Sequence, residues 1–427
     1  MSTQSLYLLY KEHPIITTDT RNCPADSLFF ALKGERFNAN QFAAQALEAG
    51  SAFAIIDEPE YATDSRFLLV DDVLTALQDL AAYHRAQLTI PIIGITGTNG
   101  KTTTKELTKA VLSTRFNTLA TEGNLNNHIG VPLTLLKIRP EHEMAIIEMG
   151  ANHPGEIAFL CNIANPDFGL ITNVGKAHLE GFGSLEGVIR TKTELYSSLR
   201  RNGGKLFLHF ENEYLKPHAT GLECYTYGET PDLYLSGKLT GCTPFLAFSF
   251  THEGVETEVQ TQLIGAYNLT NALVAAAIGT RFDVPAETIK AGLEQYSPSN
   301  KRSQLVKTEK NTLILDTYNA NPTSMRAALL NFKAMEVPNK MLILGGMREL
   351  GAESAAEHAG IIAYIGELGF DNVVLVGDEF NTLPHSYTAL ADANALKGWI
   401  AEHPVTDHYI LVKGSRGIAL ETGIEGL

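Results

Sequence analysis

Cysteine, basic residues and long apolar runs are all scarce in this sequence. Its 427 residues contain four cysteines, which are scattered without the spacing of a zinc site. Such scattering favours free thiols in a reducing compartment over disulfides or a metal centre. Lys and Arg number 33 against 48 Asp and Glu, and the formal net charge is −15. An acidic chain without a basic stripe is not expected to bind nucleic acid.

Signals for membranes and export are missing too. The longest apolar stretches, such as residues 272–278, are far shorter than a membrane span. Residues 1–14 show neither the basic segment nor the continuous apolar run of a signal peptide. We therefore expect a soluble, cytoplasmic protein with no membrane insertion. The sequence does not disclose the oligomeric state, and our expectation is a monomer.

The chain is instead rich in short apolar strands that alternate with helices, which is typical of α/β domains with mainly parallel sheets. Linker-like segments near residues 89–91 and 296–301 divide it into domains 1–89, 90–298 and 299–427. Period-two alternation in residues 256–263 predicts an antiparallel insertion in the second domain. The third domain is expected to be Rossmann-like, although it lacks the G-x-G-x-x-G motif of dinucleotide sites. Expected strands include residues 92–96, 144–149, 168–174, 205–209, 312–315, 340–344, 372–376 and 408–412, and expected helices include 40–49, 73–87 and 105–112.

The most informative motif is a glycine-rich loop, residues 94–104, between an apolar strand and a helix. Backbone N–H groups of such a loop bind polyphosphate, with Lys101 at the outer phosphates and the Thr102 hydroxyl facing magnesium. The match to a Walker A loop is incomplete, because Ile95 stands where that pattern has glycine. The loop predicts ATP binding by Gly97, Thr98, Asn99, Gly100, Lys101, Thr102 and Thr103.

A second part of a phosphate site follows at the end of another apolar strand, where residues 145–147 lead into Glu148. Its carboxylate would meet magnesium opposite Thr102, because Mg²⁺ favours carboxylate, hydroxyl and phosphate oxygens. An acid at the end of a strand is also commonly a solvated cap. His178 follows a further strand, and by itself a histidine in such a place is more often an ordinary loop histidine than a metal ligand.

Taken together, these segments resemble the Mur ligases, which add amino acids to the peptidoglycan precursor. Residues 94–104, 123–132, 148–157, 177–184 and 316–321 carry the resemblance, which extends over about residues 19–416. They are most similar to the branch that joins D-Ala-D-Ala to UDP-MurNAc-tripeptide through an acyl phosphate, releasing ADP and phosphate. The resemblance implies a central ATP-binding domain between an N-terminal UDP-sugar-binding domain and a Rossmann-like C-terminal domain. A sibling Mur or folylpolyglutamate-type ligase and a non-catalytic nucleotide-binding protein are the alternatives.

The resemblance also assigns roles that the residues alone do not reveal. His178 matches a histidine that binds a second magnesium, and Lys192 matches a lysine that CO₂ converts into a carbamate. The physics is coherent, because a deprotonated lysine captures CO₂ and becomes a carboxylate-like metal ligand. Read alone, Lys192 is an exposed lysine on a helix. The resemblance thus implies catalytic roles for Lys101, His178 and Lys192, and magnesium ligation by Thr102, Glu148, His178 and Lys192.

Nucleotide and substrate contacts complete the expected site. Asn268 and Asn271 match positions around adenine, Arg302 a phosphate-facing arginine and Asp316 a ribose-facing acid. The chain departs from the branch at Leu315, which replaces a second acid, and at Thr317, which replaces a serine. The expected substrate contacts are Arg21 and Lys33 for the UDP phosphates, Asn124, Asn126 and Asn127 for the muramoyl peptide, and Asn319, Asn321, Lys413 and Arg416 towards the incoming amino component. The cation that takes the D-Ala-D-Ala carboxylate and the third residue of the tripeptide, diaminopimelate or lysine, stay open.

Overall fold

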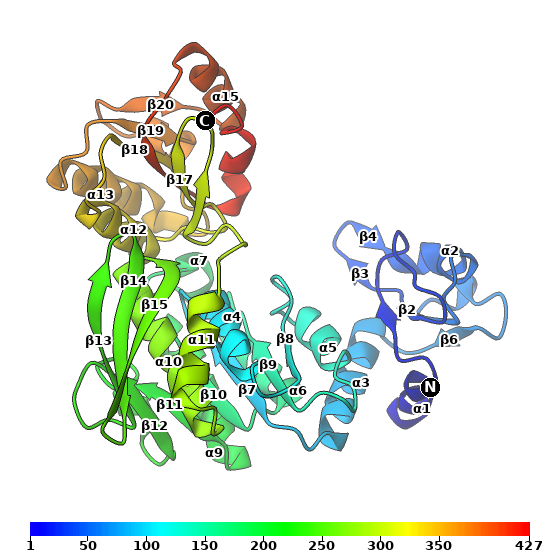
Figure 1. Ribbon diagram of the computed structural model, residues 1–427. Helices are drawn as coiled ribbons and strands as arrows, with labels where there is room; N and C mark the ends of the chain where they lie inside the picture. The colour runs from blue at the N-terminus through cyan, green and yellow to red at the C-terminus, as the bar shows by residue number, and fades with distance from the viewer.

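The computed structural model describes residues 1–427 as three α/β domains, each built on its own sheet (Figure 1). The sheets have four, nine and six strands, and a two-stranded hairpin lies beside the first. The predicted α/β class with three domains is confirmed. All four cysteines are free, as expected. No helix has the length and hydropathy needed to cross a membrane.

The N-terminal domain is a parallel sheet in the order β1–β2–β5–β6. Its elements are α1 (Thr3–Glu12), β1 (Ile16–Thr17), β2 (Leu28–Phe30), the hairpin β3 (Lys33–Gly34) and β4 (Phe37–Asn38), α2 (Ala43–Glu48), β5 (Phe53–Ile56), β6 (Phe67–Leu69) and α3 (Val73–Gln87). Helices α1 and α3 pack on the central domain. Leu6, Tyr10 and Leu77 belong to one buried apolar cluster with Leu135 and Leu160 of that domain. This shared core fixes how the N-terminal domain sits on its neighbour.

The nine-stranded sheet of the central domain runs β15–β14–β13–β12–β11–β10–β7–β9–β8. Strands β7 to β12 are parallel, and β13 is parallel to β12, whereas β14 is antiparallel to both of its neighbours, β13 and β15, which confirms the predicted antiparallel insertion. Along β15, buried and exposed residues alternate as the sequence pattern predicts. The strands are β7 (Ile92–Thr96), β8 (Thr118–Ala120), β9 (Met144–Glu148), β10 (Phe168–Ile171), β11 (Lys205–His209), β12 (Cys224–Gly228), β13 (Leu235–Cys242), β14 (Phe245–His252) and β15 (Val255–Ile264). The helices are α4 (Lys101–Leu112), α5 (Gly130–Leu135), α6 (Glu156–Ala164), α7 (Leu179–Phe182), α8 (Leu185–Lys192), α9 (Glu194–Asn202), α10 (Leu269–Arg281) and α11 (Ala286–Gln295).

The helix after the glycine-rich loop begins earlier than the sequence suggests. It was expected over residues 105–112, but α4 begins at Lys101, directly after Gly100. Gly100 has a φ of 78°, a left-handed conformation that costs glycine little. The turn therefore passes into the helix within one residue, and the first N–H groups of α4 are free to face an anion held by the loop.

The C-terminal domain has a six-stranded sheet in the order β16–β17–β21–β18–β19–β20, in which only β16 is antiparallel to its neighbour. Separate apolar clusters include residues of its sheet and of the helices packed against it. The elements are β16 (Gln304–Lys307), β17 (Thr312–Asp316), α12 (Pro322–Ala334), β18 (Lys340–Gly345), α13 (Ser354–Glu367), β19 (Val373–Val376), α14 (Asp378–Asn381), β20 (Thr388–Leu390), α15 (Ala393–Glu402) and β21 (Tyr409–Lys413).

The position of the site follows from the order of the central strands. Strand β7 lies between β9 and β10, so the chain leaves β7 with a parallel strand on either side. Open α/β sheets bind ligands beyond the carboxyl ends of such strands. The glycine-rich loop emerges at this edge, and the C-terminal domain lies over it, while the N-terminal domain stands to one side (Figure 1).

Candidate active site

A cavity of about 650 Å³ lies where the carboxyl edge of the central sheet faces the C-terminal domain. Nearly every residue singled out from the sequence lines it, although the residues come from distant parts of the chain. The lining includes Thr98, Asn99, Gly100, Lys101, Thr102, Thr103, Asn124, Asn126, Asn127, Glu148, His178, Asn268, Asn271, Arg302, Asp316, Asn319, Asn321, Lys413 and Arg416. Gly97, Lys192, Arg21 and Lys33 are the predicted site residues that do not line it.

The glycine-rich loop is held from behind by the segment that follows β10. The Thr172 hydroxyl donates to the Asn99 carbonyl at 2.6 Å, and the Asn99 N–H donates to Oδ1 of Asn173 at 2.9 Å. Gly97 has a φ of 144°, and a Cβ there would lie 2.0 Å from the Thr172 hydroxyl oxygen. Gly97 therefore shapes the loop from beneath without lining the cavity. Thr172 and Asn173 were not recognised in the sequence, because their role depends on the pairing of β10 with β7.

Lys101 folds back over its own loop. Its ammonium group donates to the carbonyls of Gly97 at 2.7 Å and Thr98 at 3.0 Å. Burial lowers the pKa of Lys101 to about 8, with Glu148 opposing the shift and Arg302 adding to it. A lysine whose only partners are neutral carbonyls is poised to exchange them for phosphate oxygens.

Glu148 is 1% exposed, so the alternative of a solvated cap at the strand end is wrong. Its carboxylate accepts hydrogen bonds from the Thr102 hydroxyl at 3.0 Å and from the Asn126 amide at 2.8 Å. A hydroxyl and a carboxylate held together offer the hard oxygen ligands that Mg²⁺ prefers. Thr102 and Glu148 therefore fit the predicted metal position.

A buried lysine that the sequence did not bring to notice supports Glu148. Lys105 is 1% exposed and donates to the Thr121 carbonyl at 2.5 Å, with Glu106 at 2.9 Å as its charge partner. The Thr121 hydroxyl in turn accepts the Glu148 N–H at 2.9 Å. Lys105 lies one helical turn after Lys101, and this i, i+4 spacing is the signal that could have revealed it.

The expectation that Lys192 is exposed when read as plain sequence is wrong, because its side chain is 2% exposed at the end of α8. The ammonium group has a single protein partner, the Ala151 carbonyl at 3.4 Å, and lies 5.4 Å from the centre of the Phe182 ring. Burial, followed by the nearby charge of Lys101, brings the pKa of Lys192 well below its usual value. A buried amine that readily loses its proton has the chemistry that carbamate formation requires.

His178 meets Glu349, a residue of the C-terminal domain. Nδ1 of His178 lies 2.5 Å from Oε2 of Glu349, and this contact holds the pKa of Glu349 below its usual range. No three His, Cys, Asp or Glu residues gather as a ready-made metal cluster. A metal ion here would therefore depend on hydroxyl and phosphate oxygens, and on a modified Lys192, in addition to Glu148 and His178.

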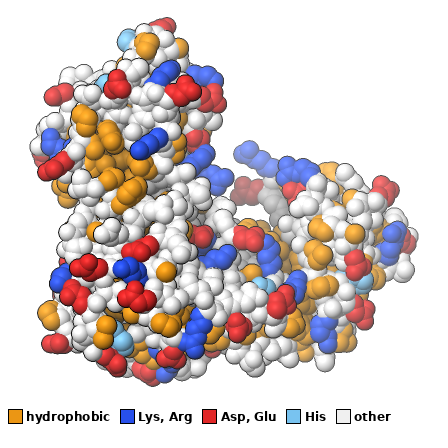
Figure 2. Space-filling model, in the orientation of Figure 1, with side chains coloured by type: hydrophobic (Ala, Val, Ile, Leu, Met, Phe, Trp, Pro, Cys, Tyr) orange, Lys and Arg blue, Asp and Glu red, His pale blue; other side chains and the backbone are white.

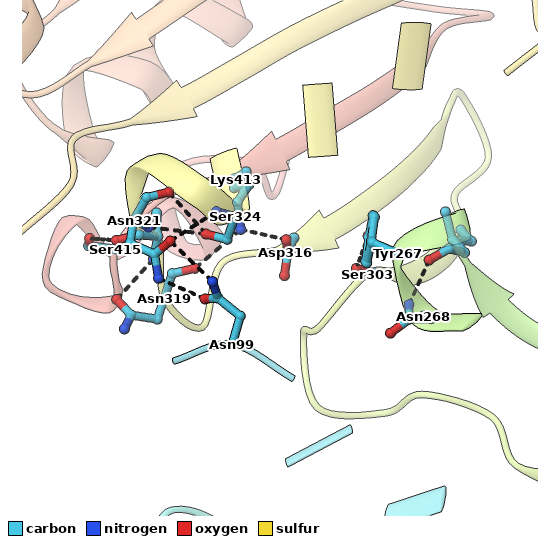
Figure 3. A network of polar contacts seen from close by, with 12 residues as sticks. Asn99, Tyr267, Asn268, Ser303, Asp316, Asn319, Asn321, Ser324, Lys413 and Ser415 are labelled. Atoms are coloured by element: carbon cyan, nitrogen blue, oxygen red, sulfur yellow. Dashed lines mark hydrogen bonds and ion pairs between the residues drawn. The ribbon is translucent and has the colours of Figure 1, made fainter. Parts of the chain in front are cut away.

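The C-terminal side of the cavity is a polar network (Figure 3). Lys413 is 1% exposed and donates to Oδ2 of Asp316 at 2.6 Å. Asn321 caps helix α12 and donates its amide to Oδ1 of Asn99 at 2.7 Å, which joins the C-terminal domain directly to the glycine-rich loop (Figure 3). Arg416 makes no ion pair and lies 5.9 Å from the centre of the Tyr318 ring. Of the two predicted cations, Lys413 is already neutralised and Arg416 is free.

Asn268 and Asn271, which were predicted to lie around adenine, form a second set of contacts. Asn271 donates its amide to Oδ1 of Asn268 at 2.9 Å and accepts the Thr104 hydroxyl at 3.0 Å. The guanidinium of Arg302 lies 3.8 Å from the centre of the Tyr318 ring, opposite the glycine-rich loop. The Tyr318 ring therefore lies near both Arg302 and Arg416, although its role was not assigned from the sequence.

Arg21 and Lys33 lie outside this cavity, on the N-terminal domain. Arg21 is 88% exposed and pairs with Asp19 at 2.6 Å, and Lys33 lies 3.1 Å from Asp57. An open gap separates this domain from the C-terminal domain (Figure 2). The proposed contacts of Arg21 and Lys33 with UDP phosphates stay a prediction.

Comparisons with known proteins agree with this geometry. Residues 95–279 match the Mur ligase middle domain, and residues 301–416 match the Mur ligase, glutamate ligase domain. The chain is 39% identical to the UDP-N-acetylmuramoyl-tripeptide--D-alanyl-D-alanine ligase of Escherichia coli, over 96% of this chain and 93% of the relative. It is 36% identical to the enzyme of the same name from Bacillus subtilis, over 96% and 92%. The crystal structure of MurF from Acinetobacter baumannii superimposes with a TM-score of 0.88 at 32% identity, covering 99% of this chain and 97% of that one.

Proposed function

The chain belongs to the Mur ligase family, and we propose that its cavity joins D-Ala-D-Ala to UDP-MurNAc-tripeptide with ATP as the source of energy. The observation that carries this proposal is the gathering of the glycine-rich loop, Glu148, His178 and Asp316 around one cavity. Identity of 39% over almost the whole chain favours this branch over the sibling ligases. The folylpolyglutamate synthase of Thermotoga maritima shares the fold at only 14% identity and a TM-score of 0.61.

The reaction begins with transfer of the γ-phosphoryl group of ATP to the terminal carboxylate of the tripeptide. The loop N–H groups at the start of α4 hold the phosphates. The ammonium group of Lys101 exchanges the Gly97 and Thr98 carbonyls for oxygens of the phosphoryl group that is transferred, and so stabilises their negative charge. The amine of D-Ala-D-Ala then attacks the acyl phosphate, and inorganic phosphate leaves from the tetrahedral intermediate. ADP and phosphate are therefore the products.

Magnesium, when bound, would neutralise phosphate charge, held by Thr102 and Glu148 at one position and by His178 and a carbamate on Lys192 at another. Asn126 and Thr121 fix Glu148 for this role through its carboxylate and its backbone N–H. The carbamate of Lys192 belongs to the proposal, and its support is the burial of the amine with one distant carbonyl partner.

The C-terminal domain divides its contacts between nucleotide and amino component. Asp316 binds the ribose of ATP, and Lys413 holds that carboxylate in place. Arg416 is the free cation, so we assign the carboxylate of D-Ala-D-Ala to it, with Asn319 and Asn321 as neighbouring amide groups. Closure of the gap towards Arg21 and Lys33 would exclude water from the acyl phosphate.

The test is an assay of phosphate release from ATP with purified protein. Phosphate should appear rapidly only when UDP-MurNAc-tripeptide and D-Ala-D-Ala are both present, and tripeptides with diaminopimelate and with lysine identify the third residue. Folates or single amino acids as efficient replacements would point to a sibling ligase. AMP and pyrophosphate as products would contradict the acyl phosphate route. The proposal also places a monomeric enzyme in the cytoplasm, where its nucleotide substrates occur.

A further inference from the structure

The loop after β18 crosses the seam between the C-terminal and central domains, and the reaction described above assigns it no task. Glu349 of this loop places Oε2 2.5 Å from Nδ1 of His178. The backbone N–H of Glu180 donates to the Glu349 carbonyl at 3.5 Å. Backbone and side chain of one residue thus join this loop to the turn that carries His178.

Both members of this pair have left-handed backbones, with φ of 50° at His178 and 64° at Glu349. Residues other than glycine rarely adopt this conformation, and where they do the surrounding structure has to hold them there. Here two such positions, from different domains, direct their side chains at each other. An ion pair that only docks two surfaces does not need left-handed backbones. Lys176 and Glu357 form such a pair across the same seam at 2.7 Å, and neither of them has a positive φ.

The two atoms are 2.5 Å apart, but the direction of the contact does not meet the requirements of a hydrogen bond, so Nδ1 of His178 has no aligned partner in this structure. A turn of the ring would align the N–H of Nδ1 with this carboxylate and leave the lone pair of Nε2 for a metal ion. Histidines that bind metals are commonly oriented in this way, through a carboxylate that accepts the N–H of the other nitrogen.

We propose that Glu349 is a positioning residue that orients His178 for a metal ion, so that the second metal site is complete only when the C-terminal domain is docked. This inference rests on the metal role proposed above for His178. It makes docking and metal binding mutually favourable, since docking supplies the carboxylate that orients the ligand.

The experiment measures binding of Mn²⁺ to the full-length protein at saturating ADP by electron paramagnetic resonance. Wild type should bind two Mn²⁺ ions, and His178→Ala should lose the weaker one, which tests the metal role of His178 by itself. Glu349→Ala should weaken that second ion about 10- to 100-fold. Glu349→Gln should lose less, because its amide oxygen can accept the N–H of Nδ1 once the ring has turned.

Glu357→Ala is the matched control, because it removes a carboxylate from the same seam without touching His178. A loss confined to the Glu349 variants supports the inference, and if Glu349→Ala does not fold, the loss in Glu349→Gln decides. Second-ion affinity at the wild-type value in the Glu349 variants, or an equal loss in Glu357→Ala, would overturn it. A wild-type protein that binds no second Mn²⁺ would overturn both the metal role of His178 and the role of Glu349.

Discussion

Lys413→Met tests how the C-terminal domain divides its contacts between ATP and the amino component. Nζ of Lys413 lies 2.6 Å from Oδ2 of Asp316, and the two side chains are 2% and 16% exposed. Methionine keeps most of the length of the lysine but removes its charge, so Asp316 is left as an unpaired carboxylate. Removing one member of a buried pair costs about 3–5 kcal/mol, and the residual exposure of Asp316 favours the lower end, about 3 kcal/mol.

Urea unfolding of Lys413→Met, Asp316→Asn and the double variant isolates the pair. With Asp316→Asn already present, the lysine substitution should cost little or nothing, because it removes a buried charge that the first substitution has left unpaired. In the phosphate-release assay, KM for ATP should rise roughly tenfold, about 1.4 kcal/mol, as Asp316 loses its orientation. KM for D-Ala-D-Ala should stay within about twofold of wild type.

Arg416→Met is the matched control, since it removes a positive charge three residues further along the chain. Arg416 is exposed and makes no ion pair, so its substitution should change stability by no more than about 0.5 kcal/mol. Its KM for D-Ala-D-Ala should increase about 10-fold or more, as a charged hydrogen bond is lost. A Lys413→Met protein with wild-type stability and a raised KM for D-Ala-D-Ala alone would refute the assignment of Lys413 to Asp316.

Three further predictions follow from the burial and contacts of single residues. Lys192→Ala should lose most ligase activity, Lys192→Arg should fare no better, and formate or acetate should restore part of the activity of the alanine variant; near-normal turnover of Lys192→Ala would exclude a carbamate. Lys101→Ala should abolish phosphate release and change the melting temperature little, because the lysine bonds only two carbonyls of its own loop; a large drop in melting temperature would indicate a structural role instead. Burial lowers the pKa of His84, whose Nε2 contacts the Ile138 carbonyl at 3.2 Å. The contribution of His84 to stability should therefore be complete above about pH 6.5 and be lost as the pH falls through the lower folded-state pKa. In urea unfolding, His84→Phe should lose less stability than wild type across this pH range, and parallel losses would contradict the prediction.

Local chemistry explains why much of the nucleotide side of the site could be predicted from the sequence. Gly97 and Gly100 occupy backbone conformations that only glycine adopts easily, so the glycines in the sequence indicate the shape of the loop. Glu148 ends an apolar strand, and the carboxyl ends of neighbouring parallel strands meet at one edge. The alternation of residues 256–263 likewise predicts β15, because the period of a strand is a property of the segment itself.

The burial and charge pairing of several site residues could not be predicted from local sequence, because they depend on contacts between distant parts of the chain. The sequence shows Lys192 as a polar residue on a short helix, and only the packing of that helix buries it and lowers its pKa. In the sequence, Lys413 and Arg416 are two nearby cations with no difference in expected role. The pairing of β21 with β17 brings Lys413, but not Arg416, to Asp316. His178 and Glu349 belong to different domains, and only the docking of those domains brings their side chains together. Burial and charge pairing depend on neighbours that the chain supplies from far away, so the sequence determined which chemical groups are available and the tertiary structure decided which of them are free to act.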